Sequence, residues 1–191
     1  SRGRIYFSDP CYGDRSGMEM VDSEGRQVEG VYRIDPDGRI ARVITHEADR
    51  PNGLAISPDG KSLFVADNNN DTLGGARKLW RFTLRDDGGI EPAIWTLVHD
   101  WGATRGPDGM KFDAAGRLFV AAGLNRQNSP FETQEEPTAG IYVFSTAGEL
   151  LDVIPIPRDE CTNCAFGGED FRALIVTAGG TLWSVRLNEP G

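Results

Sequence analysis

Short apolar segments alternate with polar turns along the whole chain, and part of this pattern repeats. Three copies of one unit each begin with a polar residue that leads directly into an apolar segment: Asn52, Asp108 and Asn163. Asn52 and Asp108 are 56 residues apart, and Asp108 and Asn163 are 55 residues apart. A second apolar segment follows in each copy and begins at Leu63, Leu118 and Leu174. A long period built from short strands predicts an all-β fold, a β-propeller of four-stranded antiparallel blades.

The strand pattern predicts a single, partial propeller domain over residues 1–191. The blades are expected at approximately 1–50, 51–100, 101–157 and 158–191, and the first and last of them are incomplete. No segment shows a convincing helical period. Two full and two partial blades do not close a ring, and an open ring exposes strand edges. We therefore expect a longer parent chain or another chain to supply the missing blades.

Three long polar loops, at residues 12–29, 68–77 and 125–138, each fall between the second and third strands of a blade. Because the strands of a blade alternate in direction, equivalent loops of all blades lie at one rim of a propeller. Long loops in compact domains often carry function, so these loops could form a wall or lid. Simple tolerance of insertions at a surface is an equally good explanation.

Composition excludes several classes of partner. The formal net charge of −9 argues against nucleic acid, which requires clustered Lys and Arg. No apolar run is long enough to cross a membrane, and the sequence does not indicate a cellular compartment. Cys161 and Cys164 form a CxxC pair, but the only histidines, His46 and His99, are not in a paired zinc motif. We expect these cysteines to be small loop or core thiols.

The repeated polar residues are candidates for a shared site. Asn52 and Asp108 each precede a glycine and stand at the start of the strand that lines the axis of the propeller. Rotation about that axis would bring them together with Asn163, although Asn-Gly and Asp-Gly are also ordinary turn sequences. Amide and carboxylate oxygens suit a divalent cation, most of all Ca²⁺, with Mg²⁺, Mn²⁺ or Zn²⁺ as further possibilities.

Several stretches, taken together, resemble the SMP-30/gluconolactonase/LRE-like family of six-bladed β-propeller lactonases. The matching stretches are 5–10 with Tyr12-Gly13, 50–60, 63–67, 106–110 and 162–168. The resemblance implies that about four of six blades are represented, without the N-terminal blades. It also implies a hydrolase of carboxylic ester bonds that opens a small-molecule sugar lactone with a divalent cation.

The resemblance implies that Asn52 and Asp108 are metal ligands and places Asn163 at the pocket. A Glu and an Asn of the family site have no counterpart here, so we expect the cation site of this chain to be incomplete. Arg50 and Arg105 flank the two motifs and could bind a polyhydroxylated or acidic substrate, or be surface charges.

In the implied mechanism the cation polarises the lactone carbonyl for attack by water, and Asp108 is the best candidate to accept the proton of that water. A serine nucleophile is disfavoured because the chain has no GxSxG motif. Two alternatives stay open: a promiscuous esterase or phosphotriesterase of the same fold, and a non-catalytic propeller that binds a protein or carbohydrate.

Overall fold

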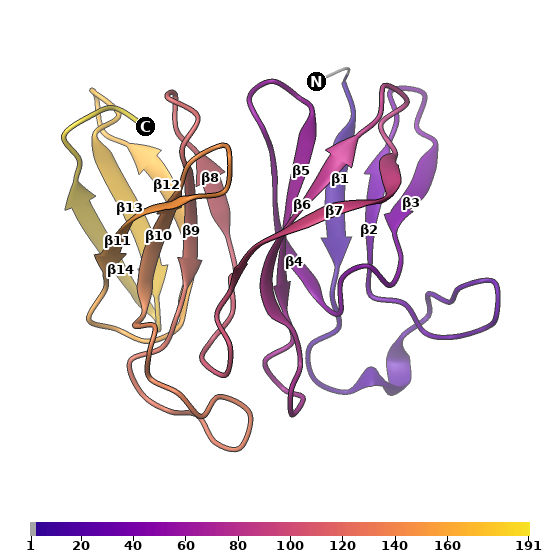
Figure 1. The fold of residues 1–191 in the computed structure, drawn as a ribbon, viewed down its shortest axis with the longest axis horizontal. Coiled ribbons are helices and arrows are strands. Elements are labelled where there is room, and N and C mark those ends of the chain that lie inside the picture. Colours follow the sequence, from indigo (N-terminus) through magenta and orange to yellow (C-terminus); the bar gives the residue numbers. More distant parts are fainter. Residues whose placement is uncertain (1–2) are drawn as a thin grey trace.

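A computed structural model describes residues 3–191 as four antiparallel β-sheets (Figure 1). The first sheet contains β1 (Ile5–Asp9), β2 (Gly30–Ile34) and β3 (Ile40–Ile44). The second contains β4 (Pro51–Ile56), β5 (Ser62–Asn68), β6 (Arg77–Leu84) and β7 (Ile90–Asp100). The third contains β8 (Met110–Phe112), β9 (Leu118–Ala122), β10 (Gly140–Phe144) and β11 (Leu150–Pro155). The fourth contains β12 (Cys161–Gly167), β13 (Ala173–Ala178) and β14 (Thr181–Arg186).

The predicted all-β fold is therefore confirmed. Within each sheet, consecutive strands pair in chain order, so every sheet is an antiparallel meander. The described residues contain one short helix, the 3₁₀ turn η1 (Arg15–Gly17), which lies in the loop between β1 and β2. No helix in the described part of the chain is long and apolar enough to span a membrane.

The apolar core lies between consecutive sheets rather than inside any one of them. Successive side chains of a strand point to opposite faces, and β5 shows this division. Leu63 and Val65 pack in the cluster shared with the first sheet, while Phe64 and Ala66 pack in the cluster shared with the third. A strand covered on both faces needs a continuous apolar run, which explains why this segment does not alternate with polar residues.

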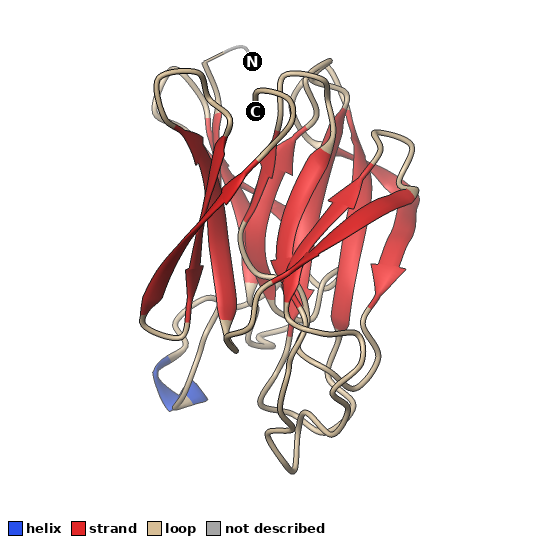
Figure 2. Ribbon diagram, turned by 90° about the vertical axis from the view of Figure 1, so that its left-hand side faces the viewer, coloured by secondary structure: helices blue, strands red, loops and turns tan. Residues whose placement is uncertain are grey.

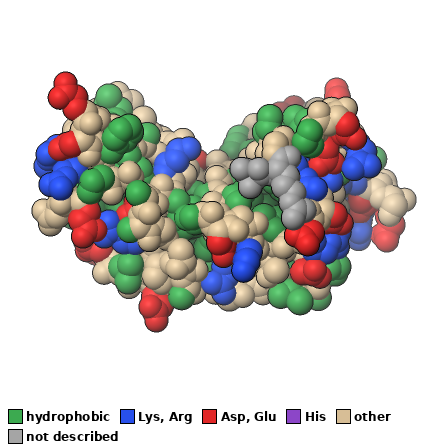
Figure 3. Space-filling model, turned by 90° about the horizontal axis from the view of Figure 1, so that it is seen from above, with side chains coloured by type: hydrophobic (Ala, Val, Ile, Leu, Met, Phe, Trp, Pro, Cys, Tyr) green, Lys and Arg blue, Asp and Glu red, His purple; other side chains and the backbone are tan. Residues whose placement is uncertain are grey.

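The three long loops lie at one end of the sheets, together with the short turn between β13 and β14, and the other short hairpin turns lie at the opposite end (Figures 1 and 2). This agrees with the predicted common rim, which we call the long-loop rim. Seen from above, the surface of the molecule is hollowed on one side (Figure 3). The first strands contact their neighbours in order: β1 contacts β4, β4 contacts β8, and β8 contacts β12.

Two glycines allow these first strands to approach closely. A Cβ atom built on Gly53 would lie 1.9 Å from the carbonyl oxygen of Asp108. A Cβ atom built on Gly109 would lie 2.3 Å from Cγ of Asn163, and the Gly109 N–H donates to the Thr162 carbonyl at 2.8 Å. These glycines are therefore required by contact with the next sheet, and neither lies in a hairpin turn.

We expect Gly53→Ala to destabilise the fold by at least about 2 kcal/mol, because an added methyl group must displace backbone of the third sheet. Gly17→Ala is the matched control, since nothing lies within 4 Å of a Cβ atom at Gly17. Urea denaturation of both variants measures the difference. Equal free energies of unfolding for the two variants would contradict the close approach.

Candidate functional site

The polar residues of the three motifs lie next to one another at the long-loop rim. In β4 the register with β5 shifts between Pro51 and Leu54, so Asn52 lies in an irregularity of the ladder. The register of β12 shifts in the same way just before Asn163. Such irregularities re-aim side chains and are common beside active sites. The contacts of Gly53 and Gly109 then place Asn52 beside Asp108 and Asp108 beside Asn163.

Tyr12 fixes the orientation of the Asn52 amide. Nδ2 of Asn52 donates to the Tyr12 hydroxyl at 2.8 Å, and that hydroxyl donates to the Asn68 carbonyl at 3.3 Å. Burial raises the pKa of Tyr12 to about 12, so the hydroxyl keeps its proton at neutral pH. Because the Tyr12 hydroxyl donates its proton to the Asn68 carbonyl, it can only accept from Asn52, so the amide must turn its NH₂ group toward Tyr12. Oδ1 of Asn52 is thereby left without a donor among the described residues and free to accept from a ligand.

Asp108 is a half-buried carboxylate without a direct partner. Among the described residues, its carboxylate makes no hydrogen bond or ion pair. Burial raises the pKa of Asp108 to about 6, although the positive charge of Arg105 opposes this shift. A carboxylate in this state is costly to ionise unless a cation or a hydrogen-bond donor approaches it.

Asn163 is exposed and lies against Gly109. Its Oδ1 accepts a hydrogen bond from the backbone N–H of Cys164 at 2.9 Å, so this oxygen is already engaged. The side chain borders the site, and its predicted contact with substrate stays a prediction.

Arg50 is not a surface residue, because its side chain is fully buried. Its Nε lies 3.0 Å from Glu29 and its guanidinium 2.7 Å from Asp71. The guanidinium also lies over the Tyr12 ring at 5.0 Å from the centroid. Arg50 therefore joins the two long loops that contain Glu29 and Asp71. Its predicted role in substrate binding stays a prediction.

Arg105 is also mostly buried, with 11% of its side chain exposed. Nε and one terminal nitrogen pair with the two carboxylate oxygens of Glu132 at 2.7 and 2.8 Å. Another terminal nitrogen lies 3.3 Å from Glu160. The alternative of a surface charge is therefore wrong for Arg105 as well, and its role toward a substrate stays a prediction.

Tyr12 and Glu29 are the contributors that sequence reasoning did not assign to the site. Tyr12 stands in one of the stretches that carry the family resemblance, which was the available signal. Glu29 ends a long polar loop, and nothing in the sequence distinguishes it from the other acidic residues there.

The described residues contain no group of three His, Cys, Asp or Glu side chains that could hold a metal ion. Cys161 and Cys164 are buried, and burial raises the pKa of both thiols to about 12. This agrees with the expected core thiols. The oxygen atoms best placed for a cation are those of Asp108 and Oδ1 of Asn52, since neither has another partner.

A sequence profile described as "SMP-30/Gluconolactonase/LRE-like region" matches residues 1–180. The chain belongs to this family. A gluconolactonase from Zymomonas mobilis subsp. mobilis is 33% identical over 197 residues, covering 99% of this chain and 49% of the relative. A 6-deoxy-6-sulfogluconolactonase from Pseudomonas putida is 29% identical, covering 93% of this chain and 56% of its own length.

A solved gluconolactonase structure from Xanthomonas campestris superposes with a TM-score of 0.70 and 31% identity, covering 97% of this chain and 54% of that chain. The predicted β-propeller and the predicted SMP-30/gluconolactonase/LRE-like resemblance are thus both confirmed. The chain spans about half the length of the curated relatives it matches.

We expect the Asp108 carboxyl to make the protein less stable as pH rises from about 4 to about 6 in the absence of divalent cations. Its pKa of about 6 in the folded protein exceeds the unfolded value of about 3.9, so the folded state binds the proton more tightly. The stabilisation is fully present below pH 4 and is lost as pH rises through 6.

Asp108→Asn isolates this effect because the amide does not titrate. The free energy of unfolding, measured in EDTA across this pH range, should fall more steeply in the parent than in the variant. Parallel pH dependences would show that the carboxyl has an ordinary pKa.

Proposed function

We propose that this chain contributes to a lactonase that hydrolyses a sugar lactone, as the names of its relatives suggest, and that the reaction depends on a divalent metal ion. The observation that carries the proposal is the half-buried Asp108 carboxylate without a partner, placed beside the free Oδ1 of Asn52. Two hard oxygens held together at the long-loop rim fit a divalent cation and leave an open side for a substrate.

Calcium is the cation that these residues fit best. Ca²⁺ takes six to eight oxygen ligands, so Asn52 and Asp108 must be joined by water and by groups from a longer chain or another chain. Mg²⁺ or Mn²⁺ would use the same oxygens. Zn²⁺ fits less well, because its preferred sulfur ligand is a thiolate and the pKa of both buried thiols is about 12.

A bound cation would supply electrostatic stabilisation of the negative charge that develops on the lactone carbonyl oxygen. Asp108 would accept a proton from the attacking water, and its raised pKa of about 6 makes it a stronger base than an ordinary carboxylate. Tyr12 would hold the Asn52 amide with its oxygen toward the site. Coordination lowers the basicity of a carboxylate, so the ligand and base roles of Asp108 compete.

In the protein that carries this chain, Asp108→Ala should reduce kcat/KM for gluconolactone by at least about 100-fold. EDTA should abolish the parent activity, and Ca²⁺ should restore it. A pH indicator follows the acid that ring opening releases. Asp152→Ala is the control, since Asp152 is an exposed carboxylate on the outer strand β11.

Unchanged turnover in Asp108→Ala would remove this residue from the mechanism. Cation-dependent cleavage of simple esters or phosphotriesters, without lactone hydrolysis, would favour the promiscuous enzyme. Absence of both activities and of cation binding would favour the non-catalytic propeller.

Tyr12→Phe should weaken Ca²⁺ binding about tenfold, because partners that orient a ligand typically contribute 10–100-fold to metal affinity. The variant removes the hydroxyl that fixes the Asn52 amide and keeps the aromatic ring beside Arg50. Calorimetric titration with Ca²⁺ measures the effect without any turnover.

Tyr6→Phe is the matched control, because it removes a hydroxyl that donates to the Gly88 carbonyl, in the turn between β6 and β7. Equal Ca²⁺ affinities in the Tyr12 and Tyr6 variants would show that the amide needs no such support.

A further inference from the structure

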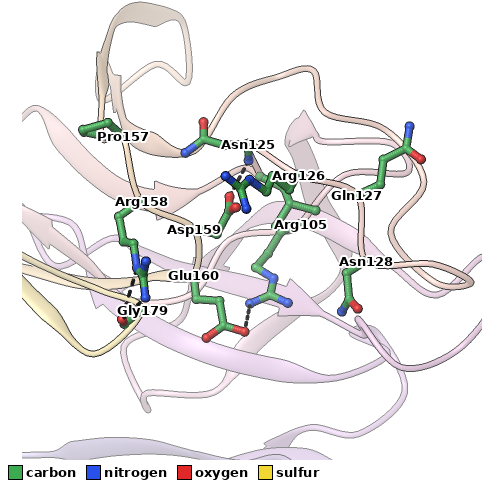
Figure 4. A pocket seen from close by; sticks show the side chains of 11 residues that line it. Arg105, Asn125, Arg126, Gln127, Asn128, Pro157, Arg158, Asp159, Glu160 and Gly179 are labelled. Carbon is green, nitrogen blue, oxygen red and sulfur yellow. Dashed lines mark hydrogen bonds and ion pairs between the residues drawn. The ribbon is translucent and has the colours of Figure 1, made fainter.

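A pocket of about 450 Å³ opens at the long-loop rim (Figure 4). It is lined by Arg105 from the connection between β7 and β8, by the start of the β9–β10 loop, by the connection between β11 and β12, and by the turn between β13 and β14. Arg105 lines the pocket and also acts electrostatically on Asp108, so the pocket and the candidate site share one wall. Its volume lies within the range of small-molecule sites.

Three arginines line this pocket in a chain whose net charge is −9: Arg105, Arg126 and Arg158. The charge of Arg105 is balanced by Glu132 and Glu160. Arg126 is exposed and makes no ion pair or hydrogen bond among the described residues. Arg158 donates only to the Gly179 carbonyl, so its charge has no carboxylate partner within the described chain. Two guanidinium groups of the pocket are therefore free to bind an anion.

The carboxylates of the pocket are already engaged. Asp159 accepts a hydrogen bond from the backbone N–H of Asn125, and Glu160 pairs with Arg105. The backbone of Glu160 has a φ of +62°, a left-handed conformation that is strained for a residue other than glycine. Such strain is retained where the surroundings require it, and it is concentrated at functional sites. Here the strained residue contacts the arginine that joins the pocket to Asp108.

We propose that this pocket binds an anionic substituent of the lactone substrate, a phosphate or sulfonate group, through Arg126 and Arg158. The inference rests on the proposed lactonase function, because it makes the pocket a specificity subsite beside the reacting group. Guanidinium groups suit such anions because their planar donors pair with two oxygens at once. A substrate anchored here would extend along Arg105 toward Asp108 and Asn52.

Calorimetric titration with gluconate and with 6-phosphogluconate tests the subsite without requiring catalysis. The phosphorylated compound should bind at least about tenfold more tightly, because its phosphate adds charge-assisted hydrogen bonds to the guanidinium groups. Arg126→Gln and Arg158→Gln should each remove most of this preference and leave gluconate binding unchanged. Both side chains are exposed, so neither substitution disturbs the core.

Arg172→Gln is the matched control for the loss of one positive charge. Arg172 lies between β12 and β13, at the opposite rim, and its side chain has no ion pair in the described chain. If Arg172→Gln lowered the preference for 6-phosphogluconate equally, the preference would be explained by the net charge of the protein alone, and this would overturn the proposal. Equal affinities for the two ligands would overturn it as well.

Inorganic phosphate serves as a further probe. Phosphate alone should bind more weakly than 6-phosphogluconate, because it lacks the contacts of the sugar chain. Equal binding would identify a general anion site that is unconnected with substrate, and this too would overturn the proposal. If lactone hydrolysis is absent but these binding differences hold, the proposed reaction fails and the anionic subsite stands.

Discussion

The close approach of the first strands is the constraint on which the candidate site depends. Gly53 contacts the backbone of Asp108, and Gly109 contacts the side chain of Asn163, so no side chain larger than hydrogen fits at either glycine. The residue that precedes each glycine is thereby set beside its equivalent in the next sheet. The arrangement of Asn52, Asp108 and Asn163 is therefore a consequence of blade packing. A small change in the angle between sheets would move all three, and this couples the geometry of the site to the apolar layers between the blades.

A buried charge extends this constraint to the long loops. Arg50 precedes β4, and its fully buried guanidinium pairs with Glu29 from one long loop and Asp71 from another. Removing one partner of a buried pair leaves an uncompensated charge, so the two loops hold each other in place. Tyr12 completes the connection, since its ring lies beside Arg50 and its hydroxyl holds the Asn52 amide. The wall of the site and the orientation of a candidate ligand thus depend on one cluster of interactions.

Sequence patterns predicted the strands and the candidate residues because both depend on local periodicity and on the repeat. Short apolar segments identify strands, and equal spacing places Asn52 and Asp108 at the same position in successive blades. The burial of Arg50 and Arg105 was not predictable, because it depends on carboxylates 21 to 55 residues away along the chain, namely Glu29, Asp71, Glu132 and Glu160. The arginine pocket escaped prediction for the same reason, since four separate connections form it.

Two aspartates show why hydrogen-bond partners are needed to interpret a shifted pKa. Burial raises the pKa of both Asp67 and Asp108 to about 6. Asp67 accepts hydrogen bonds from the backbone of Asp49 and Arg50 and from the Trp80 indole, so its oxygens are fully used in holding the start of β4. Asp108 has the same shift and no such donors among the described residues. The Asp67 carboxylate is thus occupied by the fold, whereas the half-buried Asp108 carboxylate keeps its oxygens open to a ligand. This difference in partners, and not the shared shift in pKa, is why we propose the chemistry for Asp108.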